Sequence, residues 1–354
     1  MANYASNINI FNNNITKNDE GIMLYSSSDN NVSSNRIAEN NFYGIYLWNS
    51  SKDSISTNSI ANNWGGIMLW YSVSVNVTGN SIASNNGLGI GVSDSSLNII
   101  ANNNLTNNEY GVQLSDSSNN TVTGNTVANN EHGVAAYSPN NKFYHNNFVN
   151  NTNQVTTLIS TVNSWDDGYP SGGNYWSDYN GTDLHWGSGQ NETGSDGIGD
   201  VVYEIDADNR DRYPLMAPFN TFDAGVWNGV AYNVDVVSNS TLSNFQLNTT
   251  LKTISFNVTG VEDTAGFCRV TIPNIIVQDL WQGNYTVLLN GEPWSFRNWT
   301  DTTNTYIYVN YTYSEHQIII IPEFPSAIIL PLFMVLSVIV LVLAKKKRLK
   351  KTQT

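Results

Sequence analysis

The chain has 354 residues, a formal net charge of −14 at pH 7 and one cysteine. Six of its fifteen Lys and Arg residues lie in the C-terminal run KKKRLKK, so the remainder carries nine basic residues against 29 acidic ones. Such a surface repels polyanions, which excludes nucleic-acid binding, and the single Cys268 excludes an internal disulfide or a cysteine metal cluster.

A repeat of 22 or 23 residues fills the first 150 positions. Each copy begins at a glycine: Gly21, Gly44, Gly66, Gly89, Gly111 and Gly133. Aliphatic residues follow at one and three places after the glycine, from Ile22 and Leu24 to Val134 and Ala136. Two more apolar columns fall eleven and sixteen places after it: Val32, Ile55, Val77, Ile100, Val122, Tyr144, and Ile37, Ile60, Ile82, Leu105, Val127, Val149.

Asparagine columns accompany the apolar ones. Fourteen places after the glycine stand Asn35, Asn58, Asn80, Asn103, Asn125 and Asn147. Nineteen places after it stand Asn40, Asn63, Asn85, Asn108 and Asn130, and Thr152 breaks that column in the last copy. Asparagine tolerates unusual backbone angles, so these columns predict corners, with side-chain amides bonded from one copy to the next.

This pattern predicts a parallel β-helix. No window places apolar residues at helical spacing, and strands this short bury a face only when successive copies stack. Three strands per copy make one coil, with coils about 4.8 Å apart. A leucine-rich horseshoe is the alternative, but the L-x-x-L-x-L pattern and the helical stretch that it needs are missing.

The repeat resembles the right-handed β-helix repeats of the NosD-type family, also called CASH repeats, over about residues 7–220. The segments NSWDDGYPSGGNYWSDYNGTDLHWG and DGIGDVVYEIDADNRDRYPLMAPF are similar to those that close such helices in archaeal surface proteins. The resemblance implies an all-β solenoid outside the cytoplasm. It implies little about activity, because one fold serves many functions.

The chain divides into five predicted parts. Residues 1–154 form the β-helix, whose first coil is truncated, since Ile10, Asn13, Ile15 and Asn18 match only the second half of a copy. We therefore expect preceding sequence, including a signal peptide, in the natural protein. Residues 155–221, rich in Trp, Gly and Asp, are expected to cap the solenoid, whose open end invites aggregation.

Residues 222–321 alternate in short strands separated by turns such as Asn290-Gly291, which predicts a β-sandwich of the immunoglobulin-like class. Its Cys268 is expected to be a buried small hydrophobe. Residues 326–344 are uncharged and long enough to span a bilayer, and the basic tail 345–354 is expected to be cytoplasmic. The preceding IPEFPS resembles a P-E-F-type archaeal sorting signal. The prediction is a single-pass cell-surface protein, and its many N-x-[ST] sequons are candidate glycan acceptors.

Aromatic residues are predicted on one outer face. If the first and third residues after each glycine point inward, the second and fourth point outward. Tyr25, Trp48 and Trp70 then fall on three successive coils, with Tyr46 beside them. Flat rings at this spacing suit the stacking of sugar rings, which predicts a binding site for polysaccharide or an envelope glycan. Packing against other protein segments is the alternative use of such a patch.

Two carboxylates are weak catalytic candidates. Asp94 and Asp116 occupy the same place on adjacent coils, close enough for a retaining glycosidase pair. Both stand in SDSS turns, where Asp commonly bonds its own backbone, and no basic residue accompanies them. The expected function is therefore carbohydrate binding or an envelope or adhesion role, a polysaccharide hydrolase or lyase is the alternative, and the chain is expected not to be an enzyme.

Metal sites are the last candidates. Asp196 and Asp200 in DGIGD resemble a partial calcium loop, in which Thr193 and Gly194 replace the usual preceding acids. This predicts a possible structural Ca²⁺ in the cap. A copper-related accessory role, which the NosD resemblance implies, needs clustered His or Met. The four histidines, His132, His145, His185 and His316, have no such spacing.

Overall fold

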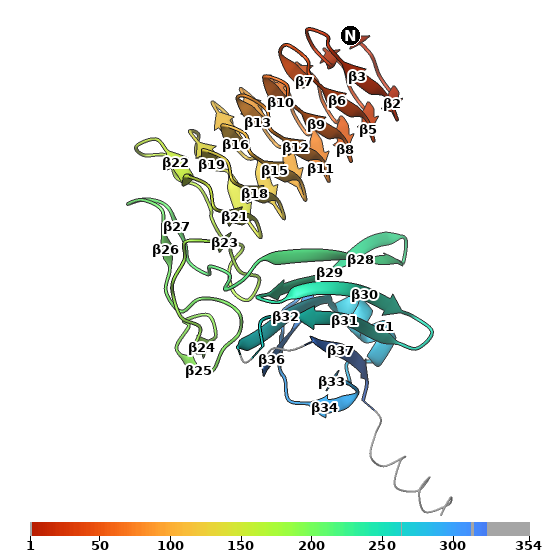
Figure 1. Cartoon of the computed structure of the whole chain (residues 1–354), viewed down its shortest axis with the longest axis vertical. Helices are drawn as coiled ribbons and strands as arrows, with labels where there is room; N and C mark the ends of the chain where they lie inside the picture. Colours follow the sequence, from red (N-terminus) through yellow and green to blue (C-terminus); the bar gives the residue numbers. More distant parts are fainter. Residues whose placement is uncertain (1, 263, 313–314, 324–354) are drawn as a thin grey trace, which may run out of the picture.

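The computed structural model describes residues 2–262, 264–312 and 315–323. A parallel β-helix runs from the N-terminus, an irregular segment closes its far end, and two antiparallel sheets follow (Figure 1). In the figure the solenoid runs from red to yellow, and the antiparallel sheets are green to blue.

Three parallel sheets form the walls of the solenoid. The first, called here sheet 1, contains β1 (Ala2–Asn3), β4 (Ile22–Tyr25), β7 (Tyr43–Trp48), β10 (Gly65–Trp70), β13 (Leu88–Ser93), β16 (Tyr110–Ser115), β19 (His132–Ala136) and β22 (Asn153–Thr157). Sheet 2 contains β2 (Asn9–Phe11), β5 (Asn31–Ser33), β8 (Ser54–Ser56), β11 (Asn76–Thr78), β14 (Ile99–Ala101), β17 (Thr121–Thr123) and β20 (Lys142–Tyr144). Sheet 3 contains β3 (Asn14–Thr16), β6 (Arg36–Ala38), β9 (Ser59–Ala61), β12 (Ser81–Ala83), β15 (Asn104–Thr106), β18 (Thr126–Ala128), β21 (Asn147–Val149) and β23 (Tyr175–Trp176).

The predicted parallel β-helix is confirmed by register and burial. Ile67 pairs with Ile45 on one side and Ile90 on the other, so equivalent residues of successive coils lie side by side. Ile67, Leu69, Val77 and Ile82 are completely buried. Inward positions therefore stack in aliphatic columns, which exclude water along the whole axis. The first coil is less truncated than the sequence indicates, because Ala2–Asn3 pair with β4.

The glycine column is needed for close packing rather than for unusual backbone angles. A Cβ atom on Gly66 would lie 2.4 Å from the carbonyl oxygen of Gly89 and 2.5 Å from Cγ2 of Ile82. Gly21, Gly44, Gly89 and Gly111 meet the same two kinds of neighbour, and at Gly133 the side chain of Asn151 replaces the aliphatic one. Any side chain here would push adjacent coils apart, which explains why every copy begins with glycine.

Buried amides connect the coils at the corners, as predicted. Nδ2 of Asn80 donates to Oδ1 of Asn103 at 3.0 Å, and the backbone N of Asn80 donates to the same oxygen at 2.9 Å. The left-handed backbone conformation lies one residue earlier than expected, for example at Asn102 (φ 56°) before Asn103. Each corner thus uses one residue to turn the chain and the next to satisfy buried backbone donors.

The sequence analysis did not predict two further polar columns. One is a serine column that includes Ser50, Ser72 and Ser95. The other follows three residues later and runs through Asn30, Asp53, Val75, Asn98, Asn120, Asn141 and Asn163. Four corners per coil therefore carry a polar ladder, where the sequence predicts two.

The sixth coil corrects the predicted columns. Phe143, Asn146 and Phe148 take the places assigned to Tyr144, Asn147 and Val149. Asn151 continues the column that Thr152 was expected to break. The reason is a missing corner residue: Ser115 and Asp116 separate Leu114 from Ser117, whereas Tyr137 alone separates Ala136 from Ser138.

The irregular segment covers the end of the core. Trp165 and Trp176, each 1 % exposed, stack on Phe143 and Phe148 with ring centroids 4.3 and 4.5 Å apart. This segment contains two short antiparallel strand pairs: β24 (His185–Trp186) with β25 (Glu192–Thr193), and β26 (Tyr203–Glu204) with β27 (Arg210–Asp211). The side chains of Asn209 and Asp211 accept the backbone N–H groups of Asn163 and Asn174, which ends two ladders.

Two five-stranded antiparallel sheets share one apolar core, in partial agreement with the predicted sandwich. One contains β28 (Phe219–Trp227), β29 (Val230–Ser238), β32 (Ala265–Pro273), β36 (Asn304–Thr312) and β35 (Arg297–Thr300). The other contains β30 (Thr241–Asn248), β31 (Thr253–Thr259), β37 (Glu315–Pro322), β33 (Tyr285–Leu289) and β34 (Glu292–Trp294). Helix α1 (Asn274–Trp281) departs from the all-strand prediction, and Cys268 is buried as expected.

The predicted membrane span 326–344 and basic tail 345–354 lie outside the described residues. Within the part of the chain that the structure describes, no helix is both long and apolar enough to cross a bilayer.

Candidate functional site

Sheet 1 carries aromatic side chains on its outer surface. Tyr25, Trp48 and Trp70 end β4, β7 and β10 and pair in register, as the alternation predicts. The rings of Tyr25 and Trp48 are nearly parallel, with centroids 6.4 Å apart, and Trp48 and Trp70 are 5.1 Å apart and tilted by 47°. All three are half-buried, so each ring keeps an accessible part.

Other rings extend the patch beyond the residues expected from sequence. Tyr71 is 49 % exposed and meets Trp48 edge to face at 5.2 Å. Tyr43 stacks on the predicted Tyr46 at 5.5 Å and meets Trp64 edge to face at 5.3 Å. We call the whole set the aromatic face; its members are Tyr25, Tyr43, Tyr46, Trp48, Trp64, Trp70 and Tyr71.

Sequence reasoning missed three of these residues for a structural reason. Tyr71 lies in a left-handed corner (φ 50°), and Tyr43 and Trp64 lie where the chain enters sheet 1, outside the clean alternation. In neighbouring copies these residues stand near the start of a sheet 1 strand or just after its end, and that position is the feature of the sequence that could have revealed them.

Polar groups line the edge of the aromatic face. Oδ2 of Asp94 accepts hydrogen bonds from Nε1 of Trp70 at 3.2 Å and from Oγ of Ser93 at 3.1 Å. At the opposite edge, Oε2 of Glu20 accepts the backbone N–H of Tyr43, and burial raises the pKa of Glu20 above its usual value. Burial, with the nearby Tyr43 and Glu20, raises the pKa of Tyr46 to about 12. The face therefore presents neutral rings bordered by hydrogen-bond acceptors.

The aromatic face does not continue along the whole sheet. Ser93 and Ser115 follow Trp70 in register, and Gly91, Gln113 and Ala135 continue the column that begins at Met23 and Tyr46. The columns of Trp70 and Tyr46 thus continue with small or polar side chains over the next two coils. Farther along the sheet, Tyr110 of β16 stacks on His132 of β19 at 4.7 Å, a smaller pair of rings outside the aromatic face.

The catalytic candidates occupy equivalent corners. Asp94 and Asp116 have left-handed backbones (φ 48° and 49°) on adjacent coils. Asp94 is bound to Trp70, and neither residue forms an ion pair with a described residue. The geometry provides no positively charged partner to assist a reaction, and their catalytic role stays a prediction.

The calcium candidates accept hydrogen bonds within their own loop. Asp196 is completely buried; its Oδ1 accepts the backbone N–H of Ile198 at 3.0 Å. The Asp200 carboxylate accepts the backbone N–H groups of Leu184 and His185 at 2.8 and 3.0 Å. Burial opposes charge on Asp200, but these bonds hold its pKa below the usual value. Local donors thus stabilise both carboxylates, and bound Ca²⁺ stays a prediction.

The matches to known proteins concern the solenoid. Residues 38–181 match the family model described as periplasmic copper-binding protein (NosD). The match covers less than half of the chain and is a likeness of its repeats. No protein of curated function matches the sequence significantly.

The solenoid also resembles solved structures at low identity. They include the mannuronan C-5 epimerase AlgE6 A-module of Azotobacter vinelandii (17 % identity, TM-score 0.36, covering 45 % of this chain and 57 % of that one). The Dettilon tailspike protein gp208 has 14 % identity and a TM-score of 0.34, and the match covers 86 % of this chain and 65 % of that one. The enzymatically active domain of bacteriophage CBA120 tailspike protein 2 has 10 % identity and a TM-score of 0.31, and the match covers 88 % of this chain and 52 % of that one. The matches span about half to two thirds of those chains, and we take no functional argument from likeness at this level.

The copper chemistry in the family's description lacks a fitting donor set in the described residues. His132 stacks on Tyr110, His145 on Phe219, and His185 bonds Asp200. No three His, Cys, Asp or Glu side chains of the described part come together in a way that suits a metal ion. We therefore derive no copper-dependent step.

Proposed function

We propose that this protein is a cell-surface β-helix protein that binds polysaccharide, or another envelope glycan, through the aromatic face. The observation that carries the proposal is the row of half-buried rings of Tyr25, Trp48 and Trp70 on three consecutive coils. Aromatic side chains present large apolar surfaces with a polar edge, and a contiguous exposed patch on a soluble surface commonly marks an interaction site.

The shape of the face suits an extended chain of sugars. The three rings span two interstrand spacings, about 10 Å along the solenoid axis. Asp94 and Glu20 add acceptors for hydroxyl groups at two edges. Strands β4, β7 and β10 hold the rings of Tyr25, Trp48 and Trp70, so little conformational entropy opposes binding.

The decisive experiment compares Trp48→Ala and Trp70→Ala with Phe11→Ala. Phe11 is 58 % exposed on sheet 2, away from the aromatic face, and serves as the matched control. We expect both tryptophan variants to lose at least tenfold in retention on immobilised polysaccharides, with a change in unfolding free energy of about 1 kcal/mol, the centre of the range for point substitutions. Phe11→Ala should bind like the wild type. Unfolding of both tryptophan variants would show that the rings serve packing instead.

One contact favours an enzymatic alternative, a polysaccharide hydrolase or lyase. Asp94 touches Trp70 and therefore lies where a bound sugar would pass. Asp94→Asn should abolish turnover of a bound polysaccharide if this alternative holds. Retained binding without measurable turnover in the wild type supports the non-catalytic proposal.

The proposal includes the predicted membrane anchor at 326–344, which leaves the binding face outside the cell. Removal of residues 324–354, which leaves β37 intact, should move the protein from the membrane fraction to the soluble fraction in cell fractionation. Retention in the membrane fraction would contradict the anchor and leave the aromatic face untouched.

A further inference from the structure

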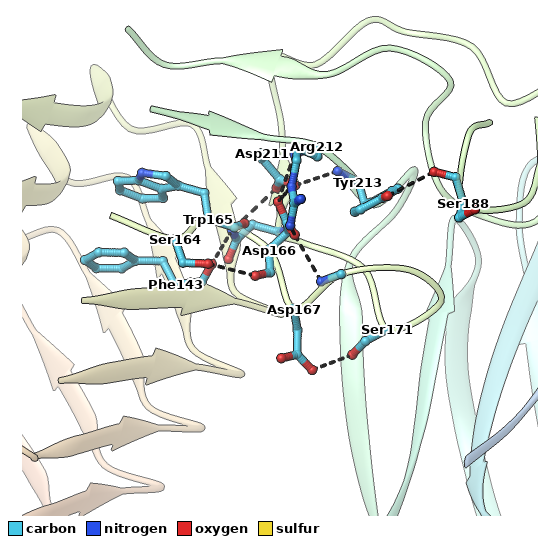
Figure 2. Close-up of polar contacts among 12 residues, drawn as sticks. Phe143, Ser164, Trp165, Asp166, Asp167, Ser171, Ser188, Asp211, Arg212 and Tyr213 are labelled. Carbon is cyan, nitrogen blue, oxygen red and sulfur yellow. Dashed lines mark hydrogen bonds and ion pairs between the residues drawn. The ribbon is translucent and has the colours of Figure 1, made fainter. Parts of the chain in front are cut away.

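A pocket of about 490 Å³ opens where the last coils meet the hairpin β26–β27. Its wall includes Lys142 of β20, residues 162–166 of the segment after β22, and residues 208, 210 and 212 around β27. We call it the junction pocket, defined by Lys142, Asn163, Asp166, Asp208, Arg210 and Arg212. Figure 2 shows part of it, with Arg212 facing Asp166 beside the stacked rings of Trp165 and Phe143.

The junction pocket concentrates positive charge in an acidic protein. Three of the nine basic residues outside the C-terminal tail line it: Lys142, Arg210 and Arg212. Arg212 is engaged by Asp166 through two bonds, Nε to Oδ2 at 2.9 Å and Nη2 to Oδ1 at 2.6 Å. Lys142 and Arg210 are exposed and form no ion pair or side-chain hydrogen bond with any residue that the structure describes. Two cationic groups therefore remain available to a ligand.

Asn163 ends the buried amide ladder at the wall of the junction pocket. Its residue is only 9 % exposed, its Oδ1 accepts the backbone N–H of Asn141, and its own N–H bonds Oδ1 of Asn209. Its Nδ2 is buried without a partner among the described residues and has almost no solvent-accessible surface. The groups that the pocket offers to a ligand are therefore the exposed side chains of Lys142 and Arg210.

We infer that the junction pocket binds the carboxylate of an acidic sugar, such as a uronic acid. The side chains of Lys142 and Arg210 are donors that a carboxylate accepts, and charge-assisted bonds of this kind are strong. The carboxylate of Asp208 faces the same pocket and accepts sugar hydroxyl groups. The volume falls within the range of small-ligand sites, about 300–1,000 Å³, and far exceeds the need of a bare anion. The pocket is separate from the aromatic face, so either site can fail alone.

The test is calorimetric titration of the full-length chain with glucuronate, with glucose and with sulfate as comparison ligands. We expect glucuronate to bind and glucose not to bind detectably at the same concentration. Arg210→Gln and Lys142→Gln should each weaken glucuronate binding at least tenfold. The matched controls are Arg36→Gln and Lys52→Gln, which remove the same charges from exposed positions elsewhere on the solenoid.

Several results would overturn the inference. Equal binding of glucose, or binding of sulfate without glucuronate, would exclude a sugar acid as the ligand. Unchanged affinity in Arg210→Gln, or an equal loss in Arg36→Gln, would exclude the junction pocket. Loss of glucuronate binding in Trp70→Ala, with Arg210→Gln unaffected, would place the acid on the aromatic face. Thermal unfolding of each variant confirms that the exposed substitutions leave the fold intact.

Discussion

Asp53 places a carboxylate in a buried column where most coils have asparagine. Its Oδ1 accepts both the backbone N–H and the Nδ2 of Asn30, each at 2.9 Å. Its Oδ2 is buried without a partner among the described residues. Burial raises the pKa of Asp53 above its ordinary 3.8, and the bonds from Asn30 only partly oppose this. At neutral pH the column therefore contains a desolvated charge that opposes folding.

Asp53→Asn should stabilise the protein. The new Nδ2 would face the carbonyl of Ser27, as Nδ2 of Asn98 faces that of Ser72 at 3.2 Å. We expect a gain of about 1–2 kcal/mol in unfolding free energy at pH 7, the usual cost of an unsatisfied buried polar group. A raised folded-state pKa means that the wild type gains stability as the pH falls through that pKa, so the advantage of the variant should shrink in acid.

Denaturant unfolding at several pH values measures this difference. Asn98→Asp is the converse control, because it places a carboxylate in the same column two coils later, where Oδ1 of Asn98 accepts the backbone N–H of Val75. It should lose stability at pH 7 and recover in acid. A lower stability of Asp53→Asn at neutral pH would contradict the assignment of Asp53 as a buried charge that destabilises the fold.

At the scale of elements, the coil is the unit of construction. Apart from the first and last strand of each sheet, every strand of the three solenoid sheets pairs with the equivalent strands one coil before and one coil after it. Ladders follow the same rule, since Asn80 bonds Asn58 and Asn103. Stability in such a solenoid is approximately a sum of coil and neighbour terms, so a whole coil can be removed without changing the type of any contact.

Deletion of residues 89–110, one complete 22-residue coil, should give a folded and shorter solenoid. β10 would pair with β16, Ile67 would meet Val112, and Asn80 would bond Asn125, all from equivalent positions. The circular dichroism spectrum should remain that of a β protein, and thermal unfolding should remain cooperative. Deletion of residues 89–99, half a coil, is the control and should unfold the chain, because it places inward residues at corners. A folded half-coil variant would contradict the coil as the unit.

Most of the solenoid was predictable because stacking forces equivalent residues into the same environment. Glycine, aliphatic and asparagine columns each reflect one contact that repeats along the axis. The slip in the sixth coil was not recognised, because the columns were counted from Gly133 and a corner residue is missing after Ala136. The pattern Asn141, Asn146, Asn151, which repeats the spacing of Asn120, Asn125 and Asn130, was the available signal.

The candidate sites were less predictable than the fold. Alternation placed Trp48 and Trp70 on the outer surface, because it depends only on strand geometry. The junction pocket depends on Lys142 meeting Arg210 across an irregular segment, and no periodicity relates these residues. Helix α1 lies in a region of expected short strands, and the sequence pattern did not predict it for the same reason: outside the repeat, each residue has its own environment.

At the scale of the whole molecule, His145 joins three parts of the structure. It occupies a corner of the sixth coil, its Nε2 lies 3.1 Å from the carbonyl oxygen of Ser171 in the irregular segment, and its ring stacks on Phe219 of β28 at 4.4 Å. Desolvation lowers the pKa of His145 to about 4, against the opposing influence of Ser171 and Asp167. The folded protein therefore keeps this histidine neutral at pH values where the unfolded chain protonates it.

His145→Asn tests this assignment, because asparagine accepts the left-handed backbone (φ 58°) and already stands at the equivalent Asn102. At pH 8 the variant should be less stable by about 1–2 kcal/mol, since it loses the ring contact with Phe219. Because the pKa of His145 is lowered in the folded state, the wild type loses stability as the pH falls from about 6.5 to about 4. The loss is about 2 kcal/mol after allowance for partial exposure. The two stability curves should therefore converge in acid when unfolding is followed at fixed denaturant. Asp183 and Asp211, whose pKa values burial raises to about 7, titrate in both proteins and cancel in the difference. Curves that stay parallel from pH 8 to pH 4.5 would show that His145 titrates as it does in the unfolded chain.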